Sequence, residues 1–238
     1  HATASGEDTL CDLFPFACTT FHDARLVETE PLHLEQSPLA ACKERAFSTE
    51  EEFVTYAPVP PDGNPIISDG DLLGPDCEIC ARNRELLTPF KVEVDLGLDA
   101  ADVIDVDTEL VAFSTELDDP SGQFTAGDLL ATNGAAIPNQ ALLWAFKVDY
   151  DIGLDAVYFV GPKDAVVDLL SYAARLTREE WLADPQRLAE MLEEAGLDLW
   201  FSTEGTPPPL ENPQFLDGDL LSAVSGTVVE QQYDLLPS

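Results

Sequence analysis

Phe113-Ser114-Thr115-Glu116, followed by Gly127-Asp128-Leu129-Leu130, is the stretch that decides the fold, because both tetrapeptides recur in the same order elsewhere in the chain. An earlier pair is Phe47-Ser48-Thr49-Glu50 with Gly70-Asp71-Leu72-Leu73, and a later pair is Phe201-Ser202-Thr203-Glu204 with Gly218-Asp219-Leu220-Leu221. Motifs that recur in a fixed order are typical of folds built from a repeated unit. The sequence therefore predicts a repeat architecture.

Further motifs keep the same order around these pairs. The first two units continue with a double leucine, a Phe-Lys-Val and then a Gly-Leu-Asp-Ala, and a third Gly-Leu-Asp precedes Trp200. These motifs are Leu86-Leu87, Phe90-Lys91-Val92 and Gly97-Leu98-Asp99-Ala100 in the first unit, Leu142-Leu143, Phe146-Lys147-Val148 and Gly153-Leu154-Asp155-Ala156 in the second, and Gly196-Leu197-Asp198 before the third.

Short β-rich runs lie between the motifs, bounded by Gly, Pro, Asp or Ser. They are residues 110–113, 156–160 and 197–201, with turn glycines leading into strands near residues 134–137 and 226–229. Such runs predict strands. We expect a mainly β fold whose repeat-built architecture is propeller-like or sandwich-like.

Residues 163–195 break this pattern, because their apolar residues recur at helical spacing. Thr177 with Glu180 predicts a capping box, Asp184-Pro185 predicts a second helix start, and Gly196 is placed to end a helix. We expect two or three helices inserted before the last unit.

Residues 1–46 contain none of the repeated motifs and are expected to form an irregular, cysteine-containing N-terminal cap, followed by the repeat-built domain 47–238. All five cysteines lie in the first third of the chain: Cys11, Cys18, Cys42, Cys77 and Cys80. Disulfides are the favoured interpretation, with the pairing open and one thiol left over. Cys77-Glu78-Ile79-Cys80 also fits a zinc knuckle completed by other cysteines or histidines, or a redox dithiol.

The charge balance is extreme, with 46 acidic against 11 basic residues and a formal net charge of -35. Such a surface repels phosphate backbones and anionic lipids, which excludes nucleic acid as a partner and argues against membrane binding. No apolar run is long enough to span a membrane. Cations and basic proteins are the ligands that this charge favours.

The run from Leu96 to Val106, followed by Val111-Ala112-Phe113-Ser114, resembles a degenerate repeat of secreted bacterial surface proteins, many of which carry PEP-CTERM-type sorting signals. Asp102 stands at one of that repeat's paired acids, Val103 replaces the other, and Ile104-Asp105 match. The resemblance covers about residues 47–238 apart from the helical insertion. It implies an extracellular or cell-surface, repeat-built β protein of no assigned activity.

Recurring aspartates are the strongest site candidates, in Gly-Asp-Leu-Leu and in Gly-Leu-Asp. Calcium requires several hard oxygen ligands, which closely spaced carboxylates in a turn supply. The predicted ligands are Asp69, Asp71, Asp128, Asp217 and Asp219, with Ala126 standing where the middle unit lacks an aspartate. The alternative interpretation, which we favour, is that each aspartate caps its own turn.

A catalytic role for Ser48, Ser114 or Ser202 is not favoured, because none is flanked by the glycines of a nucleophile elbow and all three histidines precede residue 34. An N-terminal His1 could chelate copper if His22 or His33 joined it, but a purification-tag remnant is the simpler interpretation. Trp144, Trp181, Trp200, Tyr150 and Tyr158 could line a carbohydrate platform, although burial is the more common fate of such residues.

The sequence thus predicts a binding or structural module outside the cell, with calcium as the hypothesised ligand and another surface or matrix protein as the hypothesised partner. The alternatives are a secreted enzyme, either a carboxylate-pair hydrolase or a copper oxidase, and a subunit of a larger surface assembly. Two close carboxyl groups in a cleft would favour the hydrolase.

Overall fold

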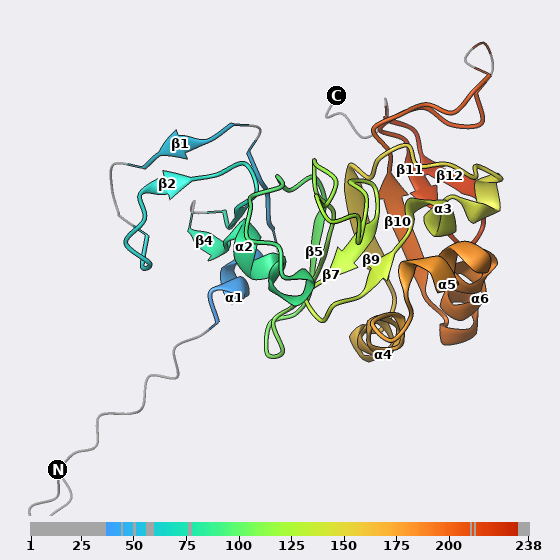
Figure 1. Cartoon of the computed structure of the whole chain (residues 1–238). Helices are drawn as coiled ribbons and strands as arrows, with labels where there is room; N and C mark the ends of the chain where they lie inside the picture. Colours follow the sequence, from blue (N-terminus) through green and yellow to red (C-terminus); the bar gives the residue numbers. More distant parts are fainter. Residues whose placement is uncertain are drawn as a thin grey trace, which may run out of the picture. The chain divides into compact units, whose positions relative to one another are not determined.

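Four small antiparallel sheets account for most of the regular structure in the computed structural model of the chain (Figure 1). The structure describes residues 37–43, 45–49, 51–55, 60–75, 78–209, 211 and 213–232, which belong to one compact unit. The prediction of a mainly β fold is confirmed for this part of the chain.

The described strands are β1 (Phe53–Val54), β2 (Ile66–Ile67), β3 (Leu72–Leu73), β4 (Ile79–Ala81), β5 (Ala101–Asp105), β6 (Leu110–Phe113), β7 (Leu129–Ala131), β8 (Ala136–Ile137), β9 (Ala156–Val160), β10 (Asp198–Ser202), β11 (Leu220–Ser222) and β12 (Thr227–Glu230). The described helices are α1 (Leu39–Cys42), α2 (Asn83–Leu86), α3 (Asn139–Leu142), α4 (Lys163–Ala173), α5 (Arg178–Ala183) and α6 (Gln186–Ala195), with short 3-10 turns η1 (Thr88–Phe90) and η2 (Trp144–Phe146).

Two of the sheets are four-stranded meanders, with strand orders β5-β6-β7-β8 and β9-β10-β11-β12. In each, the first strand starts next to a Gly-Leu-Asp-Ala, the second includes the phenylalanine of Phe-Ser-Thr-Glu, and the third includes the leucines of Gly-Asp-Leu-Leu. The pair β3-β4 holds the equivalent leucines of the first unit, and Phe47 joins it through a bridge to Leu73. The sequence motifs therefore occupy matching positions in the strands.

The sheet β5-β6-β7-β8, called the middle sheet below, is buried on both faces, since every residue of β6 and β7 is buried. Val111 and Phe113 belong to one core cluster, together with residues of the first unit such as Leu72 and Leu86. Leu110 and Ala112 belong to the other cluster, which also contains residues of α4, α5 and α6 and of the sheet β9-β10-β11-β12, called the last sheet below. Alternate residues of one strand thus supply two cores, as expected for a strand covered on both sides.

The helices expected within residues 163–195 are α4, α5 and α6, and Figure 1 shows α5 and α6 beside the sheet that contains β10. Thr177 and Glu180 form the predicted capping box, and Gly196 ends α6 in the left-handed conformation with φ 67°. The predicted start at Asp184-Pro185 was one residue early, because α6 begins at Gln186. The strand expected at residues 197–201 is likewise shifted by one residue, to Asp198–Ser202.

Cys42 and Cys80 lie at disulfide distance, with the two sulfurs 1.98 Å apart. This pair joins α1 to β4, and both cysteines are buried in the core of the first unit. Cys80 is therefore not bonded to Cys77 within the C-x-x-C. Cys77, Cys11 and Cys18 lie outside the described residues.

The expected burial of the aromatic residues holds only in part. Trp181 is fully buried, but Trp144, Tyr150 and Tyr158 are 43%, 42% and 57% exposed. The expectation failed for Tyr158 because it alternates with the buried Val157 and Phe159 along β9 and points to the opposite face of the sheet. No helix among the described residues is long and apolar enough to cross a membrane.

Candidate functional site: an acidic pocket

The aspartate of Gly-Asp-Leu-Leu is buried in all three units and makes the same two backbone contacts each time. One carboxylate oxygen accepts the N–H of the residue three positions earlier, and the other accepts an N–H from the segment after the next strand. The donors are Ser68 and Asn83 for Asp71, Thr125 and Asn139 for Asp128, and Leu216 and Gln232 for Asp219, at N···O distances of 2.9 to 3.2 Å. These contacts are those of the turn-capping interpretation.

Two of these aspartates each form an ion pair with a different arginine. Arg82 Nη1 lies 2.6 Å from Asp71 Oδ2, and both residues belong to the first unit. Arg178 belongs to α5 in the helical segment, and its Nε lies 2.6 Å from Asp128 Oδ2 of the second unit. The hydrogen bond with Asp128 raises the pKa of Arg178. No basic side chain in the described part of the chain pairs with Asp219.

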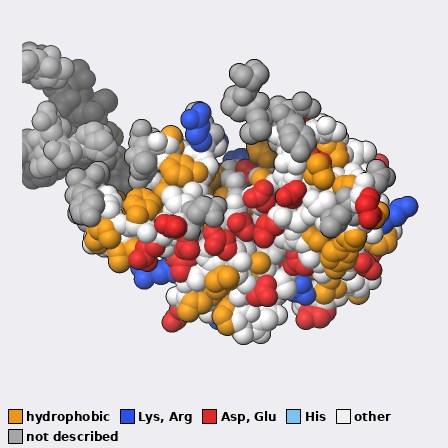
Figure 2. All heavy atoms as spheres, turned by 90° about the horizontal axis from the view of Figure 1, so that it is seen from above, with side chains coloured by type: hydrophobic (Ala, Val, Ile, Leu, Met, Phe, Trp, Pro, Cys, Tyr) orange, Lys and Arg blue, Asp and Glu red, His pale blue; other side chains and the backbone are white. Residues whose placement is uncertain are grey.

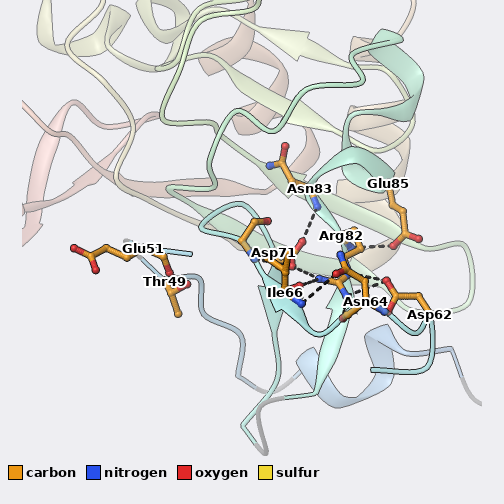
Figure 3. Close-up of polar contacts among 10 residues, drawn as sticks. Thr49, Glu51, Asp62, Asn64, Ile66, Asp71, Arg82, Asn83 and Glu85 are labelled. Atoms are coloured by element: carbon orange, nitrogen blue, oxygen red, sulfur yellow. Dashed lines mark hydrogen bonds and ion pairs between the residues drawn. The ribbon is translucent and has the colours of Figure 1, made fainter. Parts of the chain in front are cut away.

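Figure 3 shows how the first of these arginines is held. All its N–H groups find acceptors: the carboxylates of Asp62 and Asp71 and the carbonyl oxygens of Asn64 and Ile66. The hydrogen bond from Arg82 also lowers the pKa of Asp62. A guanidinium with every donor used is a structural anchor, so this cluster joins the loop before β2 to the turn between β2 and β3.

The predicted calcium ligands are therefore dispersed over separate turns. Asp69 and Asp217 flank the capping aspartates, and Asp217 accepts a hydrogen bond from Thr206. Among the described residues, no group of three or more Asp, Glu, His or Cys side chains has an arrangement that could hold a metal ion. Calcium binding at these turns stays a prediction.

A second set of carboxylates does converge, from Gly-Leu-Asp and from Phe-Ser-Thr-Glu. Asp99 is hydrogen bonded to Glu204 and is subject to electrostatic repulsion from Glu116 and Asp155. Each glutamate packs on the glycine of a Gly-Leu-Asp-Ala, Glu116 on Gly97 and Glu204 on Gly153, where a Cβ would collide with the glutamate side chain. Both glycines also have positive φ, 72° and 81°, so the conformation and the contact each require glycine.

This crowding changes the acidity of Asp99. Burial, followed by the charges of Glu204 and Glu116, raises the pKa of Asp99 to about 7. Like charges that are held together and partly removed from water disfavour ionisation, so the cluster retains a proton near neutral pH.

Asp99 and Asp155 line a pocket of about 190 Å³. Its other walls come from the first unit and from the starts of β5 and β9, and are mostly apolar. The lining residues are Ala46, Phe47, Ser48, Leu72, Leu98, Ala100, Ala101, Ala156 and Val157. The pocket thus combines mostly apolar lining residues with two carboxyl groups, the composition of many ligand-binding pockets.

Ser48 lines the pocket and follows Phe47, which forms an isolated bridge with Leu73. Ser114 donates its N–H to Ala100, and Ser202 accepts the N–H of Asp155, so the second and third Phe-Ser-Thr-Glu strands are paired on this side. At the equivalent position of the first unit, no described residue pairs with the backbone of Ser48. Phe47 uses its own backbone groups on Leu73, on the opposite side.

The repeated serines hold neighbouring segments together. Ser48 and Ser114 donate their hydroxyl protons to the carbonyl oxygens of Leu98 and Leu154, at 2.7 and 2.8 Å, and Ser202 donates to Asp155 at 3.1 Å. The three histidines lie outside the described residues, so the copper interpretation of His1 is not addressed.

Sequence analysis identified Asp99 and Asp155 as recurring aspartates, but it missed Glu116 and Glu204. The signal was present, since both glutamates belong to a recurring motif. Asp198, the third aspartate of Gly-Leu-Asp, lies apart from this cluster, where it accepts hydrogen bonds from Trp200 and Ser222.

Figure 2 shows acidic side chains gathered across the centre of one face of the molecule, with apolar groups on either side. No protein-family model, curated protein or solved structure matches this chain.

Proposed function

We propose that the chain is an extracellular or cell-surface binding module, built from a repeated β unit, which captures a basic, extended segment of another surface or matrix protein in the acidic pocket. The observation that carries the proposal is that Ser48, whose backbone pairs with no described residue, lines one pocket together with Asp99 and Asp155. The backbone of Ser48 supplies hydrogen bonds and the carboxylates supply charge.

The repeat architecture is supported by contacts that recur at matching motif positions, such as the capping bonds of Asp71, Asp128 and Asp219. The resemblance to a repeat of secreted bacterial proteins supports the location outside the cell. The Cys42–Cys80 pair adds support, because disulfides persist mainly in oxidising compartments. Four-stranded meanders that follow one another along the chain favour a propeller-like arrangement over a sandwich.

Strand addition suits the backbone at Ser48 for a physical reason. In the second and third units the place beside the serine is occupied by the start of β5 or β9, whereas in the first unit no described residue pairs with the backbone of Ser48. An exposed strand edge is a template for an incoming extended peptide. The net charge of -35 and the carboxylates of the pocket select basic side chains on that peptide.

Proton release is coupled to binding in this proposal. Asp99, with a pKa of about 7, must ionise to pair with a lysine or arginine. Affinity therefore increases as the pH rises from 6 to 8, because fewer protons remain to be displaced.

The test is fluorescence anisotropy with a labelled nine-residue peptide of alternating valine and lysine, at pH 6, 7 and 8. We expect Asp99→Asn to weaken binding about tenfold and to remove most of the pH dependence, as loss of one charge-assisted contact predicts. Asp168→Asn on α4 removes one carboxylate at an exposed position and is the matched control at pH 8, where Asp99 is ionised as well.

Equal weakening by Asp99→Asn and Asp168→Asn would show that the peptide binds the overall charge and would contradict the proposal.

Calcium is the competing occupant. If millimolar calcium at constant ionic strength raises the melting temperature of the wild type but not of Asp99→Asn, the pocket is a cation site instead.

A carboxylate-pair hydrolase is the second candidate, because Asp99 and Glu204 are two hydrogen-bonded carboxyl groups and one has a raised pKa. A carboxyl that stays protonated near neutrality can act as a general acid. Two carboxyl groups that share a proton resemble the dyad of aspartic proteases, so hydrolysis of a fluorogenic peptide panel between pH 4 and 8, abolished by Asp99→Asn and by Glu204→Gln, would support this function. Absence of turnover in the wild type would contradict it.

A further inference from the structure

The outer face of the last sheet carries two aromatic rings side by side. Tyr158 of β9 and Trp200 of β10 are directly opposed partners in the antiparallel register. Tyr158 is 57% exposed and Trp200 is partly exposed, whereas Val157, Phe159, Leu199 and Phe201, on the other face of the same strands, are buried in the core. The two rings therefore point away from the protein interior.

Comparison with the middle sheet shows that this face is not suited to another sheet of the same kind. Apart from Asp102, the register partner of Ala112, the corresponding face of the middle sheet is apolar, and it is buried against the last sheet. The motifs align the residues of the two faces one to one. The pairs are Leu110 with Asp198, Ala112 with Trp200, Leu129 with Leu220, Ala131 with Ser222 and Ile137 with Glu230. Three apolar positions have become polar and one alanine has become tryptophan, as on the outer face of a terminal repeat.

The tryptophan is held in a fixed orientation. Its indole N–H donates to a carboxylate oxygen of Asp198 at 3.0 Å. Asp198 in turn accepts the hydroxyl of Ser222 at 2.8 Å and the N–H of Leu199 at 2.8 Å. The carboxylate of Asp198 is thus used within the protein, and the ring is immobilised before any ligand arrives, which lowers the entropy cost of binding.

We propose that Tyr158 and Trp200 form a binding platform for a neutral carbohydrate chain. The apolar faces of sugar rings stack on aromatic rings, whose negative faces attract the C–H groups of the sugar. The exposed side chains of Thr227 and Glu230 on β12 belong to the same sheet and offer hydrogen bonds to sugar hydroxyls. The net charge of -35 excludes anionic polysaccharides, so the ligand is a neutral glycan.

The platform is independent of the acidic pocket, and its test uses different probes. Affinity electrophoresis of the full chain in native gels containing soluble β-glucan, xylan, starch or glycol chitosan reacetylated to neutrality measures binding to each polymer. We expect retardation in at least one neutral polymer that persists in 0.5 M NaCl, as stacking requires and charge pairing does not. Tyr158→Ala should weaken it about tenfold, and Tyr172→Ala, an exposed tyrosine on α4, should leave it unchanged.

Trp200→Phe keeps an aromatic ring but removes the donor to Asp198, so it tests the orientation without opening a large hole. A several-fold loss of binding with an unchanged melting temperature supports the proposal. The proposal is overturned if no neutral polymer retards the protein, if Tyr158→Ala and Tyr172→Ala behave alike, or if retardation disappears in 0.5 M NaCl.

Discussion

Phe47 and Phe113 begin the same tetrapeptide, yet Phe113 is fully buried and Phe47 is 39% exposed. Phe113 lies in a sheet that is covered on both faces, and its strand is paired on both edges. Phe47 is paired on one edge only within the described residues, and it lines the acidic pocket.

The difference teaches that the motif specifies local structure, whereas the neighbouring unit specifies burial. Thr49 and Thr115 make the same hydroxyl bond to the carbonyl two residues ahead, at 3.2 and 2.9 Å, although their surroundings differ. The pocket that we propose as the binding site lies where the motif is present and no described residue pairs with the backbone of its serine.

Replacing each phenylalanine by alanine tests this contrast directly. Phe113→Ala should lower the free energy of unfolding by about 4 kcal/mol, because it leaves a cavity between packed strands, and Phe47→Ala by about 1 kcal/mol. Urea unfolding followed by circular dichroism measures both. Similar losses from the two substitutions would mean that Phe47 is covered in solution.

The paired arginines provide a second contrast between the same two units. Arg82 is 9% exposed at its side chain and Arg178 is 21% exposed. Removing one member of a buried ion pair leaves the other charge uncompensated, so we expect Arg82→Met to cost about 3 kcal/mol and Arg178→Met about 2 kcal/mol.

A double-mutant cycle with Asp71→Asn controls for lost packing of the long side chain. If Asp71→Asn costs as much in the Arg82→Met background as in the wild type, the two side chains are not coupled, and the contrast between the units loses its basis.

Much of the fold could be predicted because its signals are local. Leu110–Phe113 and Ala156–Val160 are short β-rich runs bounded by turns, and they form strands at the expected residues. The capping box of Thr177 and the final Gly196 likewise depend on a few adjacent residues. Burial of the two faces of β6 in different cores was not predictable, since every residue of this run is apolar and the run carries no alternation.

The candidate site was less predictable, because it depends on contacts between distant segments. Asp99 and Glu204 are hydrogen bonded although more than a hundred residues separate them. Nothing near Asp128 in sequence indicates that its arginine comes from α5. Spacing alone could identify the recurring aspartates. It could not show which of them pair with an arginine, which accept the backbone N–H groups of a turn and which line a pocket.

The pH dependence of stability sharpens the assignment of Asp99. Its folded-state pKa of about 7 lies above the ordinary value of 3.8, so the folded protein holds a proton that the unfolded chain releases. The stability from this proton is complete below about pH 4 and is lost as the pH rises toward 7. Asp99→Asn should reduce the fall in unfolding free energy between pH 5 and pH 8 by about 1 to 2 kcal/mol, a value discounted for partial exposure.

Urea unfolding at both pH values gives this difference, with Asp168→Asn as the control at an exposed position of α4. A fall of the same size in the wild type and in Asp99→Asn would assign the titration to other carboxylates.

The smallest expected effect tests whether purely local features are equal in the two units. Lys91 and Lys147 follow η1 and η2 with the same left-handed backbone, φ 59° and ψ 32°, and both are exposed. A residue with a Cβ is strained in this conformation, so each lysine-to-glycine change should stabilise the protein by about 0.5 to 1 kcal/mol. The two gains should agree within the error of thermal unfolding, because the strain lies in the turn itself and not in what surrounds it. Unequal gains would show that neighbouring units influence even the turns, and the division between motif-specified and neighbour-specified structure would then be too simple.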